Sequence, residues 1–365
     1  MKLKKKTGPV IIILICVIYF FGAARPVPLE NVLFPRWVSS LESGEIMHLQ
    51  EAAEDTHLIP FLLGNRFGYV DGGGRFTVNK TTNAGVSFAD DRWAEYHSEL
   101  DSIEIRDVND NIINVIYDPR GYPFFLDGRI FLIGKEQNSI SEVSSYGGIL
   151  WTHEFEAPLI CVDAAAGLLV AGTLNGVVSV LDSGGNLIFS FAPGGSRYEI
   201  ILGSAISSDG SRIGIISGID PQRFLVLERH GGGLAGAGIA YRVVYHEFLD
   251  TGFRRPVHIS FIENDRWIVF ERGEGLSFFR IGSRQSSLVE LQGEVRAIDT
   301  VGGGGIFFAV VAYTEDQKKL VSINLPARMN LMAPFRSRDV FLRRTDTALF
   351  IGGGESLASF SLERK

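Results

Sequence analysis

The stretch GVVSVLDSGGNLIFSF, from Gly176 to Phe191, contains the pattern that determines the fold. Apolar residues alternate with small or polar ones on both sides of the sequence Asp-Ser-Gly-Gly-Asn. Alternation with a period of two is typical of β-strands, and Asp, Gly and Asn suit tight turns because they tolerate positive φ angles or bond their own backbone. The stretch therefore predicts a β-hairpin, and weaker copies of it lie along most of the chain.

A second hairpin pattern, a turn with Asp or Gly followed by an apolar strand, recurs at a regular spacing. Successive turns are 37, 39, 43, 55, 39 and 42 residues apart, at Asp91, Gly128, Gly167, Gly210, Asp265, Gly304 and Asp346. A period near 40 built of short strands is the signature of a β-propeller with one four-stranded blade per repeat. We therefore predict an all-β fold, a seven-bladed β-propeller, with six or eight blades as alternatives because the repeat is degenerate. The longest spacing contains GGGLAGAG (231–238), which predicts a loop insertion.

The two ends of the propeller region suggest how the ring closes. The last repeat supplies only three strands before the chain ends, and FGYVDGGGRFTVNK (67–80) precedes the first full repeat. We predict that the strand Arg75–Lys80 completes the last blade, because closure removes an exposed sheet edge.

The N-terminus predicts contact with a membrane. Lys2, Lys4, Lys5 and Lys6 precede an uncharged run from Val10 to Ala24, and lysines at this place keep the N-terminus in the cytoplasm. The apolar side chains expected in the membrane are Val10, Ile11, Ile12, Ile13, Leu14, Ile15, Val17, Ile18, Phe20 and Phe21. The run is either a retained single-pass anchor or a cleaved signal peptide, for which Gly22 and Ala24 supply small residues. Both alternatives predict a propeller outside the cytoplasm, either tethered to the inner membrane or secreted.

Three domains follow from this organisation. Residues 1–24 are the signal anchor or signal peptide, residues 25–64 a stalk or linker, and residues 65–365 the β-propeller. The stalk prediction rests on the three prolines between Arg25 and Trp37, which favour an extended chain. Trp37 would then lie at the membrane interface.

Charge and cysteine content limit the function classes. The formal net charge is −7, and without the four N-terminal lysines the chain has 31 basic and 42 acidic residues. An acidic body repels a phosphate backbone, which argues against nucleic acid as a partner. Cys16 lies in the apolar run and Cys161 stands alone in the body, so no internal disulfide is expected.

No catalytic, metal or cofactor motif can be assigned. The seven histidines form no short-spaced pair and none lies near a cysteine, so they do not predict a zinc site. The glycine runs are not followed by the helix that a phosphate loop needs. DVNDN (107–111) lacks the later Gly and Glu of a calcium loop and predicts a hairpin turn. We therefore expect no metal and no cofactor, and we assign no catalytic residue.

Two of the hairpins carry a resemblance to known repeats. DSGGNLIF (182–189) and YGGILW (146–151) resemble the quinoprotein-type repeat, and SSDGSRIGIIS (207–217) is similar to the turn of WD40-type propellers. The sequence departs from both, because no Trp-Asp dipeptide occurs and Phe189 stands where Trp151 stands in the other repeat. The resemblance implies the broad WD40-like and quinoprotein-like propeller superfamily without a specific subfamily.

These features favour a scaffold that binds proteins or peptides of the cell envelope, because propeller faces and rims consist of loops and strand edges on which binding residues collect. The loop-rich 55-residue repeat is the first candidate surface, with Arg242, His246, Phe253, Arg254 and Arg255 as its interaction residues. The alternative is an enzyme or small-molecule-binding propeller with its site at the central channel, such as a hydrolase or a sugar- or quinone-binding protein. An exposed apolar patch would favour the scaffold, and carboxylates or histidines gathered at one channel mouth would favour the alternative.

Overall fold

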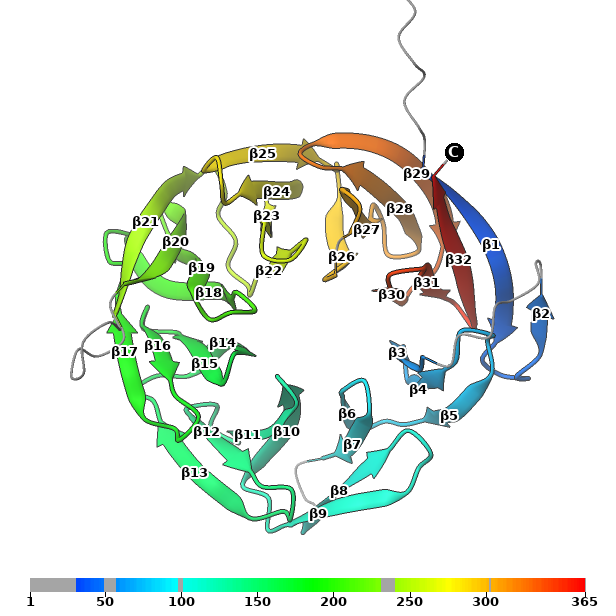
Figure 1. The fold of residues 1–365 in the computed structure, drawn as a ribbon, viewed down its shortest axis with the longest axis horizontal. Helices are drawn as coiled ribbons and strands as arrows, with labels where there is room; N and C mark the ends of the chain where they lie inside the picture. Colours follow the sequence, from blue (N-terminus) through cyan, green and yellow to red (C-terminus); the bar gives the residue numbers. More distant parts are fainter. Residues whose placement is uncertain (1–30, 49–56, 98–100, 231–239, 302, 365) are drawn as a thin grey trace, which may run out of the picture.

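The computed structural model describes residues 31–48, 57–97, 101–230, 240–301 and 303–364. These residues form 32 strands, and no helix occurs among them. The strands make eight antiparallel sheets arranged as blades around a common axis (Figure 1). The predicted all-β propeller is confirmed, but the ring has eight blades instead of seven.

We number the blades 1 to 8 in chain order, and within each blade the strands run from the axis outward. Blade 1 has three strands, β3 (Ile59–Leu63), β4 (Arg66–Val70) and β5 (Phe76–Thr81). Blade 2 contains β6 (Gly85–Phe88), β7 (Arg92–Tyr96), β8 (Ser102–Asp107) and β9 (Ile112–Tyr117). Blade 3 contains β10 (Gly121–Leu126), β11 (Arg129–Gly134), β12 (Ser139–Val143) and β13 (Ile149–Glu154). Blade 4 contains β14 (Leu159–Ala165), β15 (Leu168–Thr173), β16 (Val178–Leu181) and β17 (Leu187–Phe191).

The second half of the ring is built in the same way until its last blade. Blade 5 contains β18 (Tyr198–Ile206), β19 (Arg212–Ile219), β20 (Gln222–His230) and β21 (Ala240–Leu249). Blade 6 contains β22 (Ile259–Ile262), β23 (Trp267–Arg272), β24 (Gly275–Arg280) and β25 (Gln285–Glu290). Blade 7 contains β26 (Glu294–Ile298), β27 (Ile306–Ala312), β28 (Gln317–Asn324) and β29 (Arg328–Arg336). Blade 8 contains β30 (Val340–Arg344), β31 (Ala348–Gly353), β32 (Ser356–Arg364), β1 (Asn31–Ser40) and β2 (Ile46–His48).

The predicted number of blades was wrong because one turn fell outside the expected spacing. The seven predicted turns all lie between the first and second strands of blades 2 to 8. The eighth turn, Gly64–Asn65, connects β3 and β4 and lies only 26 residues before Asp91. The repeat is shorter here because blade 1 lacks a fourth strand. The loop insertion predicted at 231–238 lies outside the described residues.

The N-terminal strand closes the ring. Strand β1 pairs antiparallel with β32 along its whole length, from Asn31 opposite Arg364 to Ser40 opposite Ser356. The prediction that Arg75–Lys80 closes the ring was therefore wrong, because β5 is the third strand of blade 1 and pairs with β4. The register of β1 shifts between Pro35 and Trp37, and such an irregularity tolerates a residue without an N–H group.

The segment predicted as a stalk thus contributes strands β1, β2 and β3 to the propeller. Trp37 is fully buried in blade 8 and does not lie at a membrane interface. Its Nε1–H donates to the Gly72 carbonyl of blade 1 at 2.7 Å, and its ring lies 6.0 Å from that of Phe350. The side chain of Trp37 therefore contacts both blades that meet where the ring closes, blade 8 and blade 1.

The hydrophobic core is divided into eight clusters, one at each interface between adjacent blades. At the interface of blades 5 and 6, for example, the rings of Phe224 and Phe270 stack with centroids 4.2 Å apart. Between blades 6 and 7, Phe278 meets Phe307 edge to face at 5.1 Å. Because each blade is apolar on both faces, it needs a neighbour on each side, and closure supplies the last one.

Polar contacts also join neighbouring blades. Asp163 of blade 4 accepts the backbone N–H of Ile206 in blade 5 at 2.8 Å. Between blades 7 and 8, Asp299 and Arg344 form a buried ion pair of 3.1 Å. These contacts add to the apolar clusters that hold neighbouring blades together.

Candidate interaction site

The topology gives the ring two different faces. We call the side with the links between successive blades, and with the turns between second and third strands, the connection face. The opposite side, which has the remaining turns, is the hairpin face. Binding residues are expected in these loops because their side chains are not needed for packing between blades.

The structure separates the five residues of the predicted interaction loop. Arg242 and His246 lie on β21, the outer strand of blade 5, and both are exposed. Phe253, Arg254 and Arg255 lie in the link from β21 to β22 on the connection face. Only Phe253 and Arg255 come together, where the guanidinium stacks over the ring at 4.9 Å.

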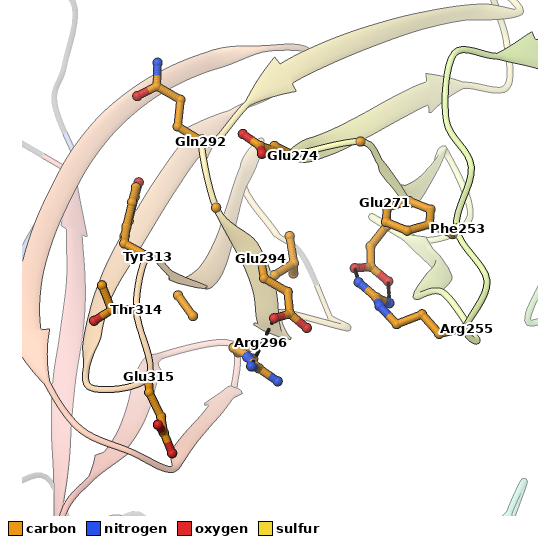
Figure 2. Close-up of a pocket in the computed structure, with 14 residues that line it drawn as sticks. Phe253, Arg255, Glu271, Glu274, Gln292, Glu294, Arg296, Tyr313, Thr314 and Glu315 are labelled. Atoms are coloured by element: carbon orange, nitrogen blue, oxygen red, sulfur yellow. Dashed lines mark hydrogen bonds and ion pairs between the residues drawn. The ribbon is translucent and has the colours of Figure 1, made fainter.

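Phe253 and Arg255 line a pocket of about 580 Å³ on the connection face at blades 6 and 7 (Figure 2). The turn between β23 and β24 supplies Glu274, and the turn between β27 and β28 supplies Tyr313 and Glu315. Glu294 and Arg296 come from β26, the innermost strand of blade 7. The pocket therefore lies between two blades and reaches toward the axis of the ring.

A bidentate ion pair fixes one wall of this pocket. Arg255 donates from Nη2 to Glu271 Oε1 at 2.9 Å and from Nη1 to Oε2 at 3.1 Å. The buried Glu271 carboxylate also accepts the backbone N–H of His258 at 2.7 Å. The hydrogen bond with Glu271 raises the pKa of the Arg255 guanidinium. Arg255 therefore holds the β21–β22 link against blade 6 and is not free to pair with a ligand carboxylate.

The opposite wall is more exposed. Glu294 and Arg296 pair at 3.0 Å with both side chains about half exposed, so this ion pair contributes little to stability. Tyr313 donates its hydroxyl to the Leu291 carbonyl at 2.8 Å. Among the described residues, no group of three His, Cys, Asp or Glu side chains could hold a metal ion. The arrangement offers polar contacts and aromatic faces to a ligand.

A second surface lies on the outer rim of blades 2 and 3. Six large apolar side chains there are between 48% and 93% exposed. They are Ile112, Ile113 and Tyr117 of β9, Tyr146 of the β12–β13 turn, and Ile149 and Leu150 of β13. We call these six residues the rim patch. The strands β9 and β13 are neighbours on the ring (Figure 1), and their outer edges pair with no other described strand.

The β12–β13 turn, which carries Tyr146, packs directly against β9. Asn114 of β9 donates its side-chain amide to the Ser144 carbonyl in the β12–β13 turn at 3.2 Å. In the same turn, Gly147 has a φ of +84° and approaches the Val115 carbonyl so closely that a Cβ would lie 2.1 Å from the oxygen. A residue with a side chain would push the turn away from β9, so Gly147 allows the turn to pack against this strand.

A family model described as a beta-propeller protein matches residues 1–364. The chain belongs to this β-propeller family. An uncharacterized protein of Treponema pallidum (strain Nichols) is 26% identical to this propeller over 303 residues, which cover 81% of this chain and 78% of that protein.

Two solved structures share the fold of this propeller. BamB from Moraxella catarrhalis superposes with a TM-score of 0.58 at 10% identity, covering 90% of this chain and all of that one. The β-propeller domain of Cps50 (Swd1) from Myceliophteria thermophila gives a TM-score of 0.52 at 10% identity, covering 72% of this chain and 93% of that domain. At such identities the likeness extends to the fold and no further, and it agrees with membership of a broad repeat-propeller superfamily.

One predicted segment lies outside the described residues, and one surface of the structure was not predicted. The membrane segment, residues 10–24, lies outside the described residues, and the part of the chain that the structure describes contains no helix able to span a bilayer. The rim patch was not predicted. The sequence features that could have indicated it are IINVIY (112–117) and YGGILW (146–151), where apolar residues occupy successive positions instead of alternate ones.

Proposed function

We propose that this propeller is a membrane-tethered, extracytoplasmic scaffold that binds envelope proteins or peptides through the rim patch. The exposed apolar side chains of that patch are the observation that carries the proposal. Large exposed apolar side chains on neighbouring outer strands favour an interaction site, because burying them against a partner removes them from water.

The open edges of β9 and β13 indicate how a partner would bind. An extended segment can add to an outer strand, with main-chain hydrogen bonds providing affinity and pockets for alternate side chains providing specificity. On β9, Ile116 packs against blade 3, so the adjacent Tyr117 points to the opposite face of the blade, where it is exposed. A partner strand added to the edge of β9 would run alongside Tyr117.

The position of β1 supports a tethered arrangement. Strand β1 begins at Asn31 beside the end of β32, on the hairpin face, and the predicted anchor ends at Ala24. A membrane segment so close to β1 would hold the hairpin face toward the bilayer. The connection face would then point away from the membrane, and the rim would be accessible from the side.

The experiment is quantitative crosslinking and pull-down from membranes with the protein at its native expression level. The test variant is Leu150→Lys, which puts a charge into the rim patch. The matched control is Leu288→Lys, the same change at an exposed leucine on the outer strand of blade 6. We expect a specific partner with the wild type and the control, and at least a tenfold loss of it with Leu150→Lys. A bait that comes down alone, or equal recovery with all three proteins, would refute the proposal.

The pocket at blades 6 and 7 favours a second candidate function, a small-molecule-binding or enzymatic propeller. Its volume of about 580 Å³ lies in the range of ligand sites, and Glu294 and Arg296 lie on an innermost strand. A thermal-shift screen with sugars and quinones tests this candidate. A stabilising compound whose effect disappears in Arg296→Met would favour it over the scaffold.

A further inference from the structure

An apolar groove lies in the outer part of the interface between blades 7 and 8 (Figure 1). Its volume is about 480 Å³, which is in the range of ligand sites. The outer strand β29 of blade 7 forms one wall, and β31, β32 and β1 of blade 8 form the other. The large apolar side chains of the walls are Leu331 and Phe335 of β29, Ile351 of β31, Phe360 of β32 and Leu33 of β1. We call this site the outer groove.

The outer groove exists because small side chains stand on strands that carry aromatic rings elsewhere. Between blades 5 and 6, Tyr245 of the fourth strand and Phe279 of the third strand pack with ring centroids 4.4 Å apart. The corresponding strands of blades 7 and 8, β29 and β32, contribute Ala333 and Ala358 to the groove. Protein interiors are normally close-packed, so a gap of this size between apolar walls has space for a second molecule.

The walls favour an occupant without polar groups along its length. Of the described residues that line the groove, only Arg336 and Ser356 have polar side chains, and both lie at its connection-face end. A peptide inside the groove would bury N–H and C=O groups against side chains that cannot pair with them, which is costly. A hydrocarbon chain has no such groups and gains free energy when it leaves water.

The shape of the groove also suits a chain. Strand β29 lines it from Leu331 to Arg336, a length of about 17 Å at ~3.4 Å per residue. At the connection-face end the walls approach each other closely, because a Cβ on Gly353 would lie 3.3 Å from the ring of Phe335. The other end, with Leu33 and Leu331, lies toward the hairpin face.

The hairpin-face end of the groove is the end nearer to the predicted membrane segment. Leu33 is the third residue of β1, and the predicted anchor ends at Ala24, nine residues earlier. Nine residues span at most about 30 Å, so a tethered propeller would hold this end close to the bilayer. The exposed Arg328 begins β29 at the same end and adds a positive charge that suits a lipid phosphate.

We propose that the outer groove binds an acyl chain of a membrane phospholipid. The inference rests on the tether of the proposed function and adds a lipid contact at a site separate from the rim patch. A single buried acyl chain gives only reversible attachment. The lipid would therefore not replace the anchor but would orient the propeller, with the hairpin-face ends of blades 7 and 8 toward the membrane.

The experiment is photolabelling of the full-length protein in phosphatidylglycerol nanodiscs. The probe is a phosphatidylglycerol with a diazirine at the end of one acyl chain, and the labelled peptides are mapped by mass spectrometry. We expect label on residues 10–24, which are predicted to lie in the bilayer, and also on residues 328–336 and 356–362. Label on β29 and β32 would mean that the chain end has left the bilayer and entered the groove.

Two variants test whether this label depends on the groove. Leu331→Lys puts a charge into one wall at a side chain that is 37% exposed, and Ala333→Phe fills the space with a ring. Each should lower the label on β29 and β32 at least tenfold. The matched control is Met332→Lys, the same kind of change at the adjacent residue, which points to the opposite face of β29 and is 47% exposed. It should leave the label unchanged.

The label on residues 10–24 separates failure of this inference from failure of the tether. If residues 10–24 are labelled but β29 and β32 are not, the inference is overturned and the tether stands. The same holds if β29 is labelled equally in the wild type, Leu331→Lys and Ala333→Phe, or if Met332→Lys loses the label as well. Absence of label from all three segments would overturn both the inference and the tether.

Discussion

At the scale of single residues, Asp163 shows how a joint between blades responds to pH. Its carboxylate accepts the N–H groups of Ile206 at 2.8 Å and of Ala164 at 2.9 Å. These hydrogen bonds favour the charged form, but burial outweighs them and raises the pKa of Asp163 to about 6. In the unfolded chain the pKa returns to the ordinary value near 3.8. The folded protein therefore holds this proton more tightly than the unfolded one does.

Asp163 should make the protein less stable as the pH rises from about 4 to above 6. A raised carboxyl pKa stabilises the fold only while the group is protonated, and the loss amounts to roughly 3 kcal/mol by linkage. In Asp163→Asn the side chain stays neutral, so this part of the pH dependence should disappear. Urea unfolding at pH 4.5 and 7.5 measures the difference, with Asp250→Asn as an exposed control. An identical pH response of wild type and Asp163→Asn would contradict the assignment.

At the scale of elements, strand β1 shows where sequence reasoning succeeded and where it failed. The turns of blades 2 to 8 could be predicted because Asp, Asn and Gly mark them at a spacing near 40 residues. Strand β1 could not be recognised, because Pro35 reads as a strand breaker although it lies at a register shift. Its partner β32 is more than 300 residues away, and no local pattern reveals such a pairing.

The candidate sites were predictable only in part, for the same reason. Phe253 and Arg255 share a link, so their proximity follows from the sequence. The partner of Arg255 is Glu271 on another strand.

Substitution of Trp37 tests the closure at the level of one element. Trp37→Ala removes a fully buried ring and the hydrogen bond to Gly72, and losses of this kind are about 3–5 kcal/mol. The measurement is the urea midpoint, with Met47→Ala on the exposed part of β2 as the control. If Trp37→Ala unfolded at the same urea concentration as Met47→Ala, β1 would behave as a stalk and not as part of blade 8.

At the scale of the whole molecule, closure creates the surfaces on which both proposals rest. The eight interface clusters tie each blade to two neighbours, so the positions of loops and rims are set by the ring as a whole. The rim patch lies on two neighbouring blades, and the pocket lined by Phe253 and Arg255 lies between two others. An open ring would separate the first blade from the last and loosen these junctions.

Hydrogen–deuterium exchange of the intact protein tests the closure most directly. Strand β1 pairs with β32 within blade 8 and contacts blade 1 through Trp37, so the amides of residues 31–40 should exchange as slowly as those of residues 356–364. Slow exchange in both segments is the result that the closed eight-bladed ring predicts. Exchange of residues 31–40 within seconds, at the rate of an unpaired linker, would contradict it.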